Sequence, residues 1–323
     1  MVPTIADLGE NESLRRTIAR LNLANSAIVG PGDDSAVVSA PDARFTVTTD
    51  TMVEGHDFRL DWSSAYDLGW KAIASNVADV AAMGAKPTSL VVALICRSTT
   101  DISWLESFAD GLRDGCISLA PEGAVVGGDL TVADTTVISV TAHGDLEGRE
   151  PVLRSGAKVG DVIAIAGTVG RAAAGLSLLQ SGNKDAISAY DEVVGFQLRP
   201  KPPIAAGIEA AIAGATSMLD ISDGLSRDAD RIAKASGVTL ALHRKDLQGY
   251  EAILEEPAIA ISTNAFDWVI DGGEDHGLLA TFPKDAKLPR AFKPIGEVVT
   301  KGAYRVTLDG APIDEGGWDS VRD

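Results

Sequence analysis

The chain has 323 residues, enough for two domains of roughly 150 residues each, and a hydrophobic fraction of 45% that can supply a globular core. Its formal net charge of −18 argues against non-specific nucleic-acid binding, which needs a basic surface. The chain has no apolar run of about 18 residues and no basic N-terminal segment followed by an apolar one, so we expect a cytoplasmic protein. Its two cysteines, Cys96 and Cys116, are expected to be free core thiols.

The first half of the chain predicts an α+β domain that ends near residue 147. Hydrophobic periodicity and turn residues indicate its elements. They are a helix over 4–22, strands over 36–38 and 45–49, a long helix over 64–83, a strand over 89–95, a helix over 103–119, and strands over 124–126 and 135–142. The strand over 45–49 is expected to end at Asp50. The long helix is expected to be capped by Ser63 or Ser64, with Asp67 in its first turn, and to end at Gly84.

The second half, residues 148–323, predicts another α/β domain. The expected elements are a strand over 162–166, a helix to about 180, a mobile polar connection over 181–195, a helix over 204–213, a loop over 220–223, a helix ending at Gly237, and strands over 238–242, 278–282 and 303–308. The proline-rich stretch 199–203 is interpreted as a turn before a helix rather than a polyproline ligand.

Seven aspartates stand where apolar runs break into glycine-rich turns, or on a helix edge. They are Asp33, Asp34, Asp50, Asp79, Asp129, Asp220 and Asp223. Carboxylates at the ends of buried strands are costly unless a cation meets them. Oxygen ligands favour a hard cation, so the pattern indicates Mg²⁺ holding phosphates.

Three of these motifs combine carboxylates with small or hydroxyl residues. Thr48-Thr49-Asp50 offers hydroxyl, carbonyl and carboxylate oxygens, and Gly127-Gly128-Asp129 lets the backbone approach a phosphate. Asp220-Ile221-Ser222-Asp223-Gly224 precedes a helix whose N-terminus favours anions. Each motif alone has a structural alternative: a polar turn for Gly30–Asp34, a helix cap for Asp223 and a solvated surface for Asp79.

Other common catalytic motifs are missing. The glycines 167, 170 and 175 do not have the spacing of a dinucleotide-binding loop, and the chain contains no P-loop and no protein-kinase signature. Four histidines and two cysteines without metal-ligand spacing argue against zinc.

Taken in order along the chain, the motifs resemble the thiamine-monophosphate kinase family, which shares its fold superfamily with aminoimidazole-ribonucleotide synthetase and selenophosphate synthetase. The matching stretches are Gly32-Asp33-Asp34, residues 48–55 (TTDTMVEG), residues 71–85 (KAIASNVADVAAMGA), Gly127-Gly128-Asp129, Arg154-Ser155-Gly156-Ala157, residues 219–225 (LDISDGL) and Gly272-Gly273-Glu274-Asp275. They cover nearly the whole chain.

The resemblance implies an α+β, two-domain aminoimidazole-ribonucleotide synthetase-like fold: an N-terminal mixed sheet that pairs in a homodimer, and a C-terminal α/β sandwich domain. It implies ATP-dependent phosphorylation of thiamine monophosphate to thiamine diphosphate, with ATP and several Mg²⁺ ions bound between the domains. The implied metal ligands are Asp34, Thr48, Thr49, Asp50, Asp79, Asp129, Asp220 and Asp223. The implied ATP contacts are Gly128, Asp129, Arg154 and Ser222, and the implied thiamine contacts are Glu274 and Trp318.

The sequence departs from the family on the substrate side. The family usually has a histidine directly before the phenylalanine that follows the Thr-Asp-Thr segment, whereas here Asp57 precedes Phe58. Either His56 takes this role or the contact is lost. His276-Gly277 follow Asp275 in place of an aromatic and an acidic residue, and the chain ends on Trp318-Asp319-Ser320-Val321 rather than the usual aromatic-Asp-His-Phe-like tail.

No protein general base is expected, because the acceptor is itself a phosphate with a second pKa of about 6. Two alternatives remain for the function. One is another ATP-dependent enzyme of the same superfamily, although selenophosphate synthetases usually carry an N-terminal reactive cysteine and here none precedes Cys96. The other is a non-catalytic nucleotide-binding protein, which would not need seven placed carboxylates.

Overall fold

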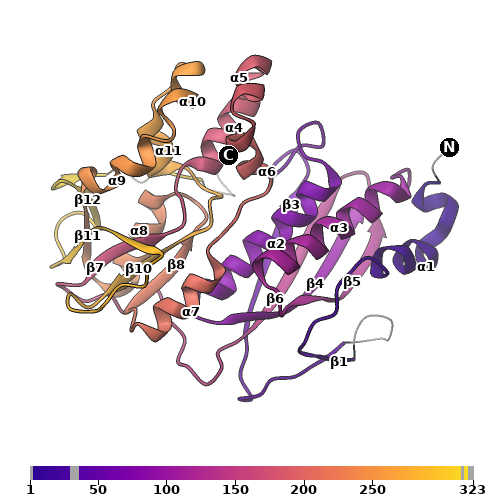
Figure 1. Cartoon of the computed structure of the whole chain (residues 1–323), viewed down its shortest axis with the longest axis horizontal. Coiled ribbons are helices and arrows are strands. Elements are labelled where there is room, and N and C mark those ends of the chain that lie inside the picture. Colours follow the sequence, from indigo (N-terminus) through magenta and orange to yellow (C-terminus); the bar gives the residue numbers. More distant parts are fainter. Residues whose placement is uncertain (1–2, 30–35, 314–315, 319–323) are drawn as a thin grey trace. The chain divides into compact units, whose positions relative to one another are not determined.

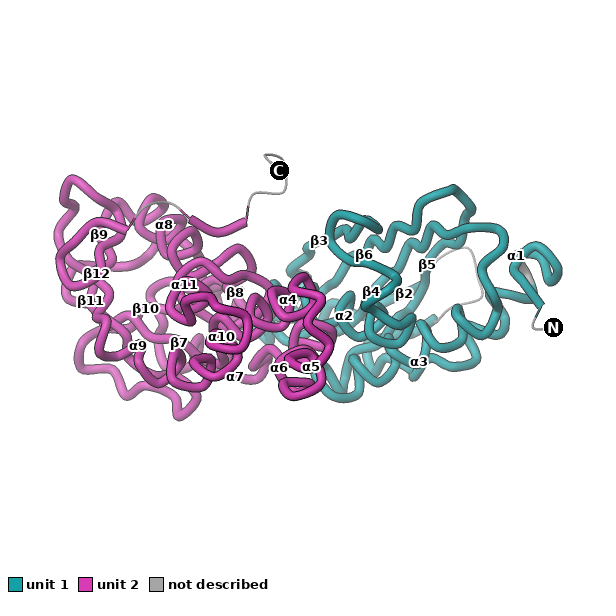
Figure 2. Tube along the Cα trace, turned by 90° about the horizontal axis from the view of Figure 1, so that it is seen from above, with its two compact units in different colours: residues 1–80, 85–148 teal, residues 81–84, 149–323 magenta. Residues whose placement is uncertain are grey.

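The computed structural model describes residues 3–29, 36–313 and 316–318 (Figure 1). Asp33 and Asp34, predicted from the sequence as part of the metal site, lie outside these residues. The chain separates into two compact units (Figure 2). Unit 1 comprises residues 1–80 and 85–148, and unit 2 comprises residues 81–84 and 149–323.

Unit 1 is built on a four-stranded sheet in the order β3-β6-β4-β5. Helices α2 and α3 cover one face of this sheet (Figure 1). Its strands and helices are β3 (Thr46–Val53), β4 (Lys86–Cys96), β5 (Ala124–Val132), β6 (Val137–Asp145), α1 (Ile5–Ile18), α2 (Ala65–Ala82) and α3 (Ile102–Leu119), and β1 (Ala27–Val29) pairs with β2 (Val37–Val38). The strands β3 and β5 are therefore the two edges of the sheet, because β6 and β4 lie between them.

The sheet has one apolar and one mixed face because side chains alternate along each strand. Along β6, Ile138, Val140 and Ala142 are buried, whereas the residues between them are half-buried. The long helix α2 begins with a reciprocal cap: the Ser64 backbone N–H donates to Asp67 Oδ2 at 3.0 Å, and the Asp67 N–H donates to Ser64 Oγ at 3.2 Å. The predicted caps and extent of this helix are confirmed.

Unit 2 is a seven-stranded sheet in the order β13-β12-β9-β11-β7-β10-β8. Apolar side chains pack on both of its faces: Ala206 and Ala210 of α7 belong to one buried cluster, and the other helices contribute to a larger one. The strands are β7 (Val162–Ala166), β8 (Ser217–Ile221), β9 (Thr239–Leu242), β10 (Gly277–Phe282), β11 (Phe292–Val299), β12 (Val306–Leu308) and β13 (Ala311–Pro312). The helices are α4 (Arg171–Ser181), α5 (Lys184–Ala189), α6 (Asp191–Leu198), α7 (Ile204–Ile212), α8 (Leu225–Ser236), α9 (Arg244–Glu251), α10 (Glu255–Ala260) and α11 (Ala265–Asp271).

Two expectations from the sequence are wrong. Residues 181–195 are not an irregular connection, because α5 and most of α6 form there, and Ala186, Val193 and Val194 are buried. Strand β3 does not end at Asp50, because residues 51–53 continue the antiparallel ladder with β6. Pairing with a neighbouring strand and burial of apolar groups outweigh the local signals in both segments.

Both cysteines are buried free thiols, as predicted. Burial raises the pKa of the Cys116 thiol to about 12. Among the described residues, no helix combines the length and the apolar composition needed to cross a membrane.

Candidate functional site

In unit 1, Thr48 and Asp79 lie together although 31 residues separate them. Thr48 is on β3 and Asp79 is on α2, and the Thr48 hydroxyl donates to Asp79 Oδ2 at 2.8 Å. Asp50 is two residues further along β3, so its side chain extends from the same face of the strand as that of Thr48. Thr48, Asp50 and Asp79 thus present three oxygen-bearing side chains on the α2 side of the sheet edge.

Thr49 points to the other face of β3. Its hydroxyl donates to the Val140 carbonyl at 2.9 Å and accepts from the Thr141 hydroxyl at 3.2 Å. The side chain of Thr49 is therefore bound to β6 rather than placed beside those of Thr48 and Asp50. Strict alternation in a strand explains the separation, because neighbouring residues cannot present side chains on one face.

Asp129 lies far from Asp50 within one copy of the chain. Cross-strand pairing runs from Asp129 to Ala93, from Ala93 to Ser139 and from Ser139 to Thr51. Asp129 is thus three strand spacings, about 14 Å, from β3, and it shares a face with Thr51 rather than with Asp50. Asp50 and Asp129 therefore do not meet within a single copy of the chain, and their assignment to one metal site stays a prediction.

Gly128 allows β5 to approach β4 closely. A Cβ added at Gly128 would lie 2.1 Å from the carbonyl oxygen of Val92, whereas a Cβ at Gly127 would meet nothing within 4 Å. Only the second glycine of the motif is thus required by the packing of the sheet. Because β5 is an edge strand of the sheet, the exposed backbone of residues 128–129 lies at this edge of unit 1.

In unit 2, the turn over residues 220–224 collects most of the residues predicted there. Asp220 is buried near the end of β8, and His276 Nδ1 lies 3.1 Å from Asp220 Oδ2. After the turn, α8 begins at Leu225. Gly224 has φ +114°, and an added Cβ would lie 2.6 Å from the Asp271 carbonyl oxygen. The turn before α8 therefore depends on glycine at this position.

Asp223 is held by two side chains of α8. The Asp223 backbone N–H donates to Asp228 Oδ2 at 3.0 Å, and Arg231 forms an ion pair with both Asp223 and Asp228. Burial and the neighbouring Asp220 carboxylate raise the pKa of Asp228 to about 7, and Arg231 opposes this only in part. Asp220, Asp223 and Asp228 are thus near one another with a single guanidinium, so the negative charge around this turn is only partly compensated.

The predicted substrate residues meet the same turn. The Glu274 N–H donates to the Ser222 carbonyl at 2.8 Å, and the Trp318 N–H donates to the Asp223 carbonyl at 3.0 Å. Trp318 is 42% exposed. Asp220, Ser222, Asp223, Glu274 and Trp318 are therefore neighbours in unit 2, although the first and the last are 98 positions apart in the sequence.

Asp275 fixes the loop that carries Glu274. It is fully buried and accepts from the Thr168 hydroxyl at 2.7 Å and from the backbone N–H groups of Arg171 and Ala172 at 3.2 Å. Burial raises the pKa of Asp275 to about 6, and these hydrogen bonds counteract the rise. Asp275 therefore caps the start of α4 and anchors the residues on either side of it.

Other contacts involve the remaining predicted residues, His56, Asp57 and Arg154. Asp57 Oδ2 accepts from the Val53 N–H at 2.7 Å, and Asp57 Oδ1 lies 3.0 Å from His56 Nδ1. Asp57 therefore closes the turn after β3, and His56 is the more exposed of the pair. Arg154 is exposed in unit 2, where its carbonyl accepts from the Ser236 hydroxyl at 3.0 Å.

Sequence reasoning missed Asp228 and Arg231. A signal was present: Leu225, Asp228, Ala229 and Ile232 have the spacing of one helix face, and the other three positions are apolar. A carboxylate on such a face is buried and therefore needs partners.

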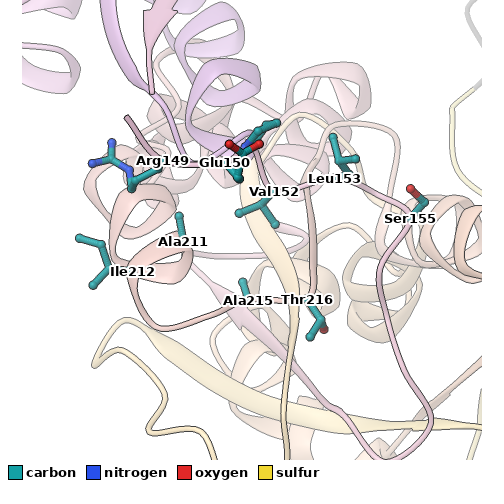
Figure 3. A pocket seen from close by; sticks show the side chains of 10 residues that line it. Arg149, Glu150, Val152, Leu153, Ser155, Ala211, Ile212, Ala215 and Thr216 are labelled. Atoms are coloured by element: carbon teal, nitrogen blue, oxygen red, sulfur yellow. The ribbon is translucent and has the colours of Figure 1, made fainter. Parts of the chain in front are cut away.

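In the parts of the chain that the structure covers, no group of three or more His, Cys, Asp or Glu side chains is arranged to hold a metal ion. A cavity of about 470 Å³ in unit 2 is lined by residues 149–153, by Ser155 and by residues of 211–216 (Figure 3), and none of the predicted site residues lines it. The size of a cavity is therefore a poor guide to the candidate site in this chain.

Comparisons with known proteins cover almost the whole chain. Residues 32–146 match the model for the AIR synthase related protein, N-terminal domain, and residues 158–309 match that for the C-terminal domain. The thiamine-monophosphate kinase of Mycobacterium tuberculosis is 41% identical over 319 residues, which are 98% of this chain and 93% of that protein.

Two solved structures extend this similarity to the fold. Thiamine-monophosphate kinase from Stenotrophomonas maltophilia has 31% identity and a TM-score of 0.77, with 94% of this chain and 96% of that chain covered. AaThiL complexed with AMPPCP and TMP has 29% identity and a TM-score of 0.78, with 96% of each chain covered.

Proposed function

The chain belongs to the thiamine-monophosphate kinase family, and on that premise we propose that it transfers the γ-phosphoryl group of ATP to the phosphate of thiamine monophosphate, forming thiamine diphosphate. The observation that carries the proposal is the meeting of Asp220, Ser222, Asp223, Glu274 and Trp318 around one turn, in a chain similar to these kinases along nearly its whole length. The turn thereby combines groups that can bind an anion with a carboxylate, that of Glu274, which can contact a cationic substrate.

The oxygen-rich side chains fit Mg²⁺. Asp79 with Thr48 in unit 1, and Asp220 with Asp223 in unit 2, provide carboxylate and hydroxyl oxygens. Mg²⁺ retains several waters and usually takes only one or two protein carboxylates besides substrate phosphates, so a ready cluster of three is not required. We assign the ions to Asp34, Thr48, Thr49, Asp50, Asp79, Asp129, Asp220 and Asp223. When bound, Mg²⁺ neutralises charge on the phosphates.

The nucleotide contacts are assigned to residues 128–129, Arg154 and Ser222. The exposed backbone at Gly128 can approach a phosphate, because no side chain intervenes. Arg154 offers a guanidinium with several donors for phosphate oxygens. Ser222 immediately precedes Asp223, so nucleotide and metal contacts would be adjacent in the turn.

The acceptor contacts are assigned to Glu274 and Trp318, with His56 at the turn after β3. The thiazolium ring of thiamine is cationic, so a carboxylate and the face of a tryptophan suit it. Asp57 serves the turn itself, since its two oxygens are engaged by Val53 and His56. His56 is therefore the better candidate of the two for a substrate contact.

The proposed transfer uses no protein general base. The acceptor phosphate has a second pKa of about 6 and is largely dianionic at neutral pH. The difficulty of the reaction is then the repulsion between two anions, and the side chains that hold and orient the phosphates decide the rate. The rate should accordingly show no essential side-chain base that titrates near pH 7.

We further propose a homodimer formed through residues 1–147, which would also bind ATP and Mg²⁺, while residues 148–323 supply the remaining nucleotide and substrate contacts. The sheet of unit 1 has two edge strands, with Asp50 on one and Asp129 on the other. A second copy pairing β5 against β3 would bring residues 128–129 of one copy beside residues 49–50 of the other. The exposed apolar residues Phe45, Val47 and Val132 on these strands or next to them support such pairing.

The proposed function is tested by measuring ADP release from ATP and Mg²⁺ with and without thiamine monophosphate. We expect release only with thiamine monophosphate, with thiamine diphosphate as the product, and none with unphosphorylated thiamine. Equal ADP release in all three conditions, or no phosphorylated product, would reject it. Sedimentation equilibrium tests the dimer, and a monomer at working concentration would reject that part.

A further inference from the structure

Gln197 contacts the carboxylate that the proposed function assigns to the substrate. It lies in the last turn of α6, is 5% exposed, and its Nε2 donates to Glu274 Oε2 at 2.6 Å. A hydrogen bond of this length to an ionised carboxylate is among the stronger ones in proteins. Most of the helix that carries Gln197 lies in residues 181–195, where the sequence predicts a mobile connection. The sequence therefore does not predict this contact.

The position of Gln197 depends on close packing between α4 and α6. A Cβ added at Gly175 on α4 would lie 2.5 Å from the Val193 carbonyl oxygen and 2.8 Å from Gln197 Cβ. The two helices therefore touch through backbone at this point. Val193 and Val194 anchor the same helix in the large apolar cluster of unit 2. Gln197 is thus held by the fold rather than by its contact with Glu274.

The contact also fixes the direction of the Gln197 amide. An ionised carboxylate only accepts hydrogen bonds, so the nitrogen must face Glu274 and the oxygen must face away from it. Within the described parts of the chain, Gln197 Oε1 is buried and has no hydrogen-bond partner. A buried carbonyl oxygen without a donor is costly, so this atom is suited to accept from an N–H group of a ligand.

Glu274 is fixed from its backbone as well. It adopts φ +66°, which is rare for a residue with a side chain, and its N–H donates to the Ser222 carbonyl. Asp275 anchors the next position. The backbone conformation of Glu274 and the hydrogen bond from Gln197 therefore both restrict the orientation of its carboxylate. A carboxylate held in this way favours a single position for a bound cation.

We propose that Gln197 is a positioning and specificity residue for the organic part of the substrate: it orients Glu274 toward a cationic heteroaromatic ring and offers Oε1 to an N–H donor of the same ligand. The inference rests on the proposed function. Thiamine monophosphate has the required chemistry, since it carries a cationic thiazolium and an aminopyrimidine with an exocyclic amine. Gln197 acts through Glu274 and the ligand, and takes no part in transferring the phosphoryl group.

The experiment measures equilibrium binding of two ligands by titration calorimetry, alongside turnover. The ligands are thiamine monophosphate and oxythiamine monophosphate, which has a carbonyl in place of the exocyclic amine. Gln197→Met keeps the side-chain volume but loses both polar atoms, and Gln197→Asn keeps an amide that is too short. Gln180→Met on the exposed surface of α4 is the matched control. Thermal unfolding confirms that each variant is folded.

We expect Gln197→Met and Gln197→Asn to weaken binding of thiamine monophosphate about 10-fold or more, with the KM for ATP unchanged within about twofold. Gln180→Met should bind as the wild type does. The wild type should bind thiamine monophosphate more tightly than oxythiamine monophosphate. Gln197→Met should lose this preference, because the ligand's amine then has no Oε1 acceptor and its hydrogen bond no longer contributes to binding.

Unchanged binding in folded Gln197 variants, or an equal rise in the KM for ATP, would overturn the inference. Retention of the ligand preference in Gln197→Met would overturn the Oε1 contact in particular. Wild-type protein that binds thiamine monophosphate through Gln197 but transfers no phosphate would reject the proposed function and leave the inference supported. Wild-type protein that does not bind thiamine monophosphate at all would reject both.

Discussion

The two units present their candidate metal ligands in different ways. In unit 1, Asp50 and Asp129 are exposed residues within the two edge strands, β3 and β5. In unit 2, Asp220 and Asp223 belong to a largely buried turn in which Asp228, Arg231 and His276 hold them. Because Asp50 and Asp129 are exposed, we expect their replacement to affect folding less than replacement of the buried residues of the unit 2 turn.

This difference also bears on where the cation fits. Asp223 and Asp228 share the single guanidinium of Arg231, and Asp220 adds a further negative charge near Asp228, so binding of Mg²⁺ at this turn would relieve a charge imbalance. The edge-strand carboxylates of unit 1 remain in contact with water and carry little such cost. We expect the stability of unit 2 to respond more strongly to Mg²⁺ than that of unit 1.

The largest expected effect separates function from folding in unit 1. Asp50→Asn and Asp129→Asn should each lower turnover about 10²–10³-fold, the loss found when one charge-stabilising group is removed from an active site. Their thermal unfolding should match that of the wild type, because both residues are exposed. Near-normal Mg²⁺-dependent turnover in either variant would contradict the metal assignment.

The second prediction tests the turn in unit 2 through a residue that is not an assigned ligand. Asp228→Ala leaves the Asp223 N–H and part of Arg231 without a buried acceptor, so we expect a loss of about 2–3 kcal/mol in the free energy of unfolding. Urea unfolding measures it. Asp230→Ala on the same helix removes a surface pair with Arg305 and should cost less than about 1 kcal/mol. Equal losses in the two variants would contradict the network.

The third prediction compares two adjacent glycines of β5. Gly128→Ala places a methyl group against the Val92 carbonyl and should destabilise the protein by about 1–3 kcal/mol. Gly127→Ala meets nothing within 4 Å and should be neutral or slightly stabilising. Urea unfolding of both variants provides the measurement. A neutral Gly128→Ala would show that the β4–β5 contact is looser than described.

The smallest expected effect is a difference in pH dependence. Arg97 and Thr136 lower the pKa of Glu54 in unit 1 to about 2, so its contribution to stability is present above pH 4.5 and is lost as the pH falls toward 2. Burial raises the pKa of Asp228 in unit 2 to about 7, so stability is instead lost as the pH rises from about 4 through 7.

Unfolding measured across this pH range tests both signs. Glu54→Gln should flatten only the acid side of the profile, by a small amount because Arg97 is 43% exposed. Asp228→Asn should flatten only the range between about pH 4 and pH 7. If each variant flattened the stability profile on the side opposite to the expected one, the two pKa directions would be wrong.

The sequence predicted the family resemblance and the two-domain α+β fold, and both are confirmed. It also predicted the caps of α2. Helix caps and hydrophobic periods can be read locally, because the residues that make them are three or four positions apart. The α5–α6 segment escaped prediction because its helices are short and depend on packing against α4.

By itself the sequence determined the inventory of this protein: the oxygen ligands, the glycine-rich turns, the elements with strong periodicity and the family they belong to. Only the tertiary structure decided which of these residues meet. Strand order separated Asp50 from Asp129, alternation separated Thr49 from Thr48, and helix packing brought Gln197 to Glu274. The physical reason is that pairing register and helix contacts are set by burial across the whole unit, and no local spacing encodes them.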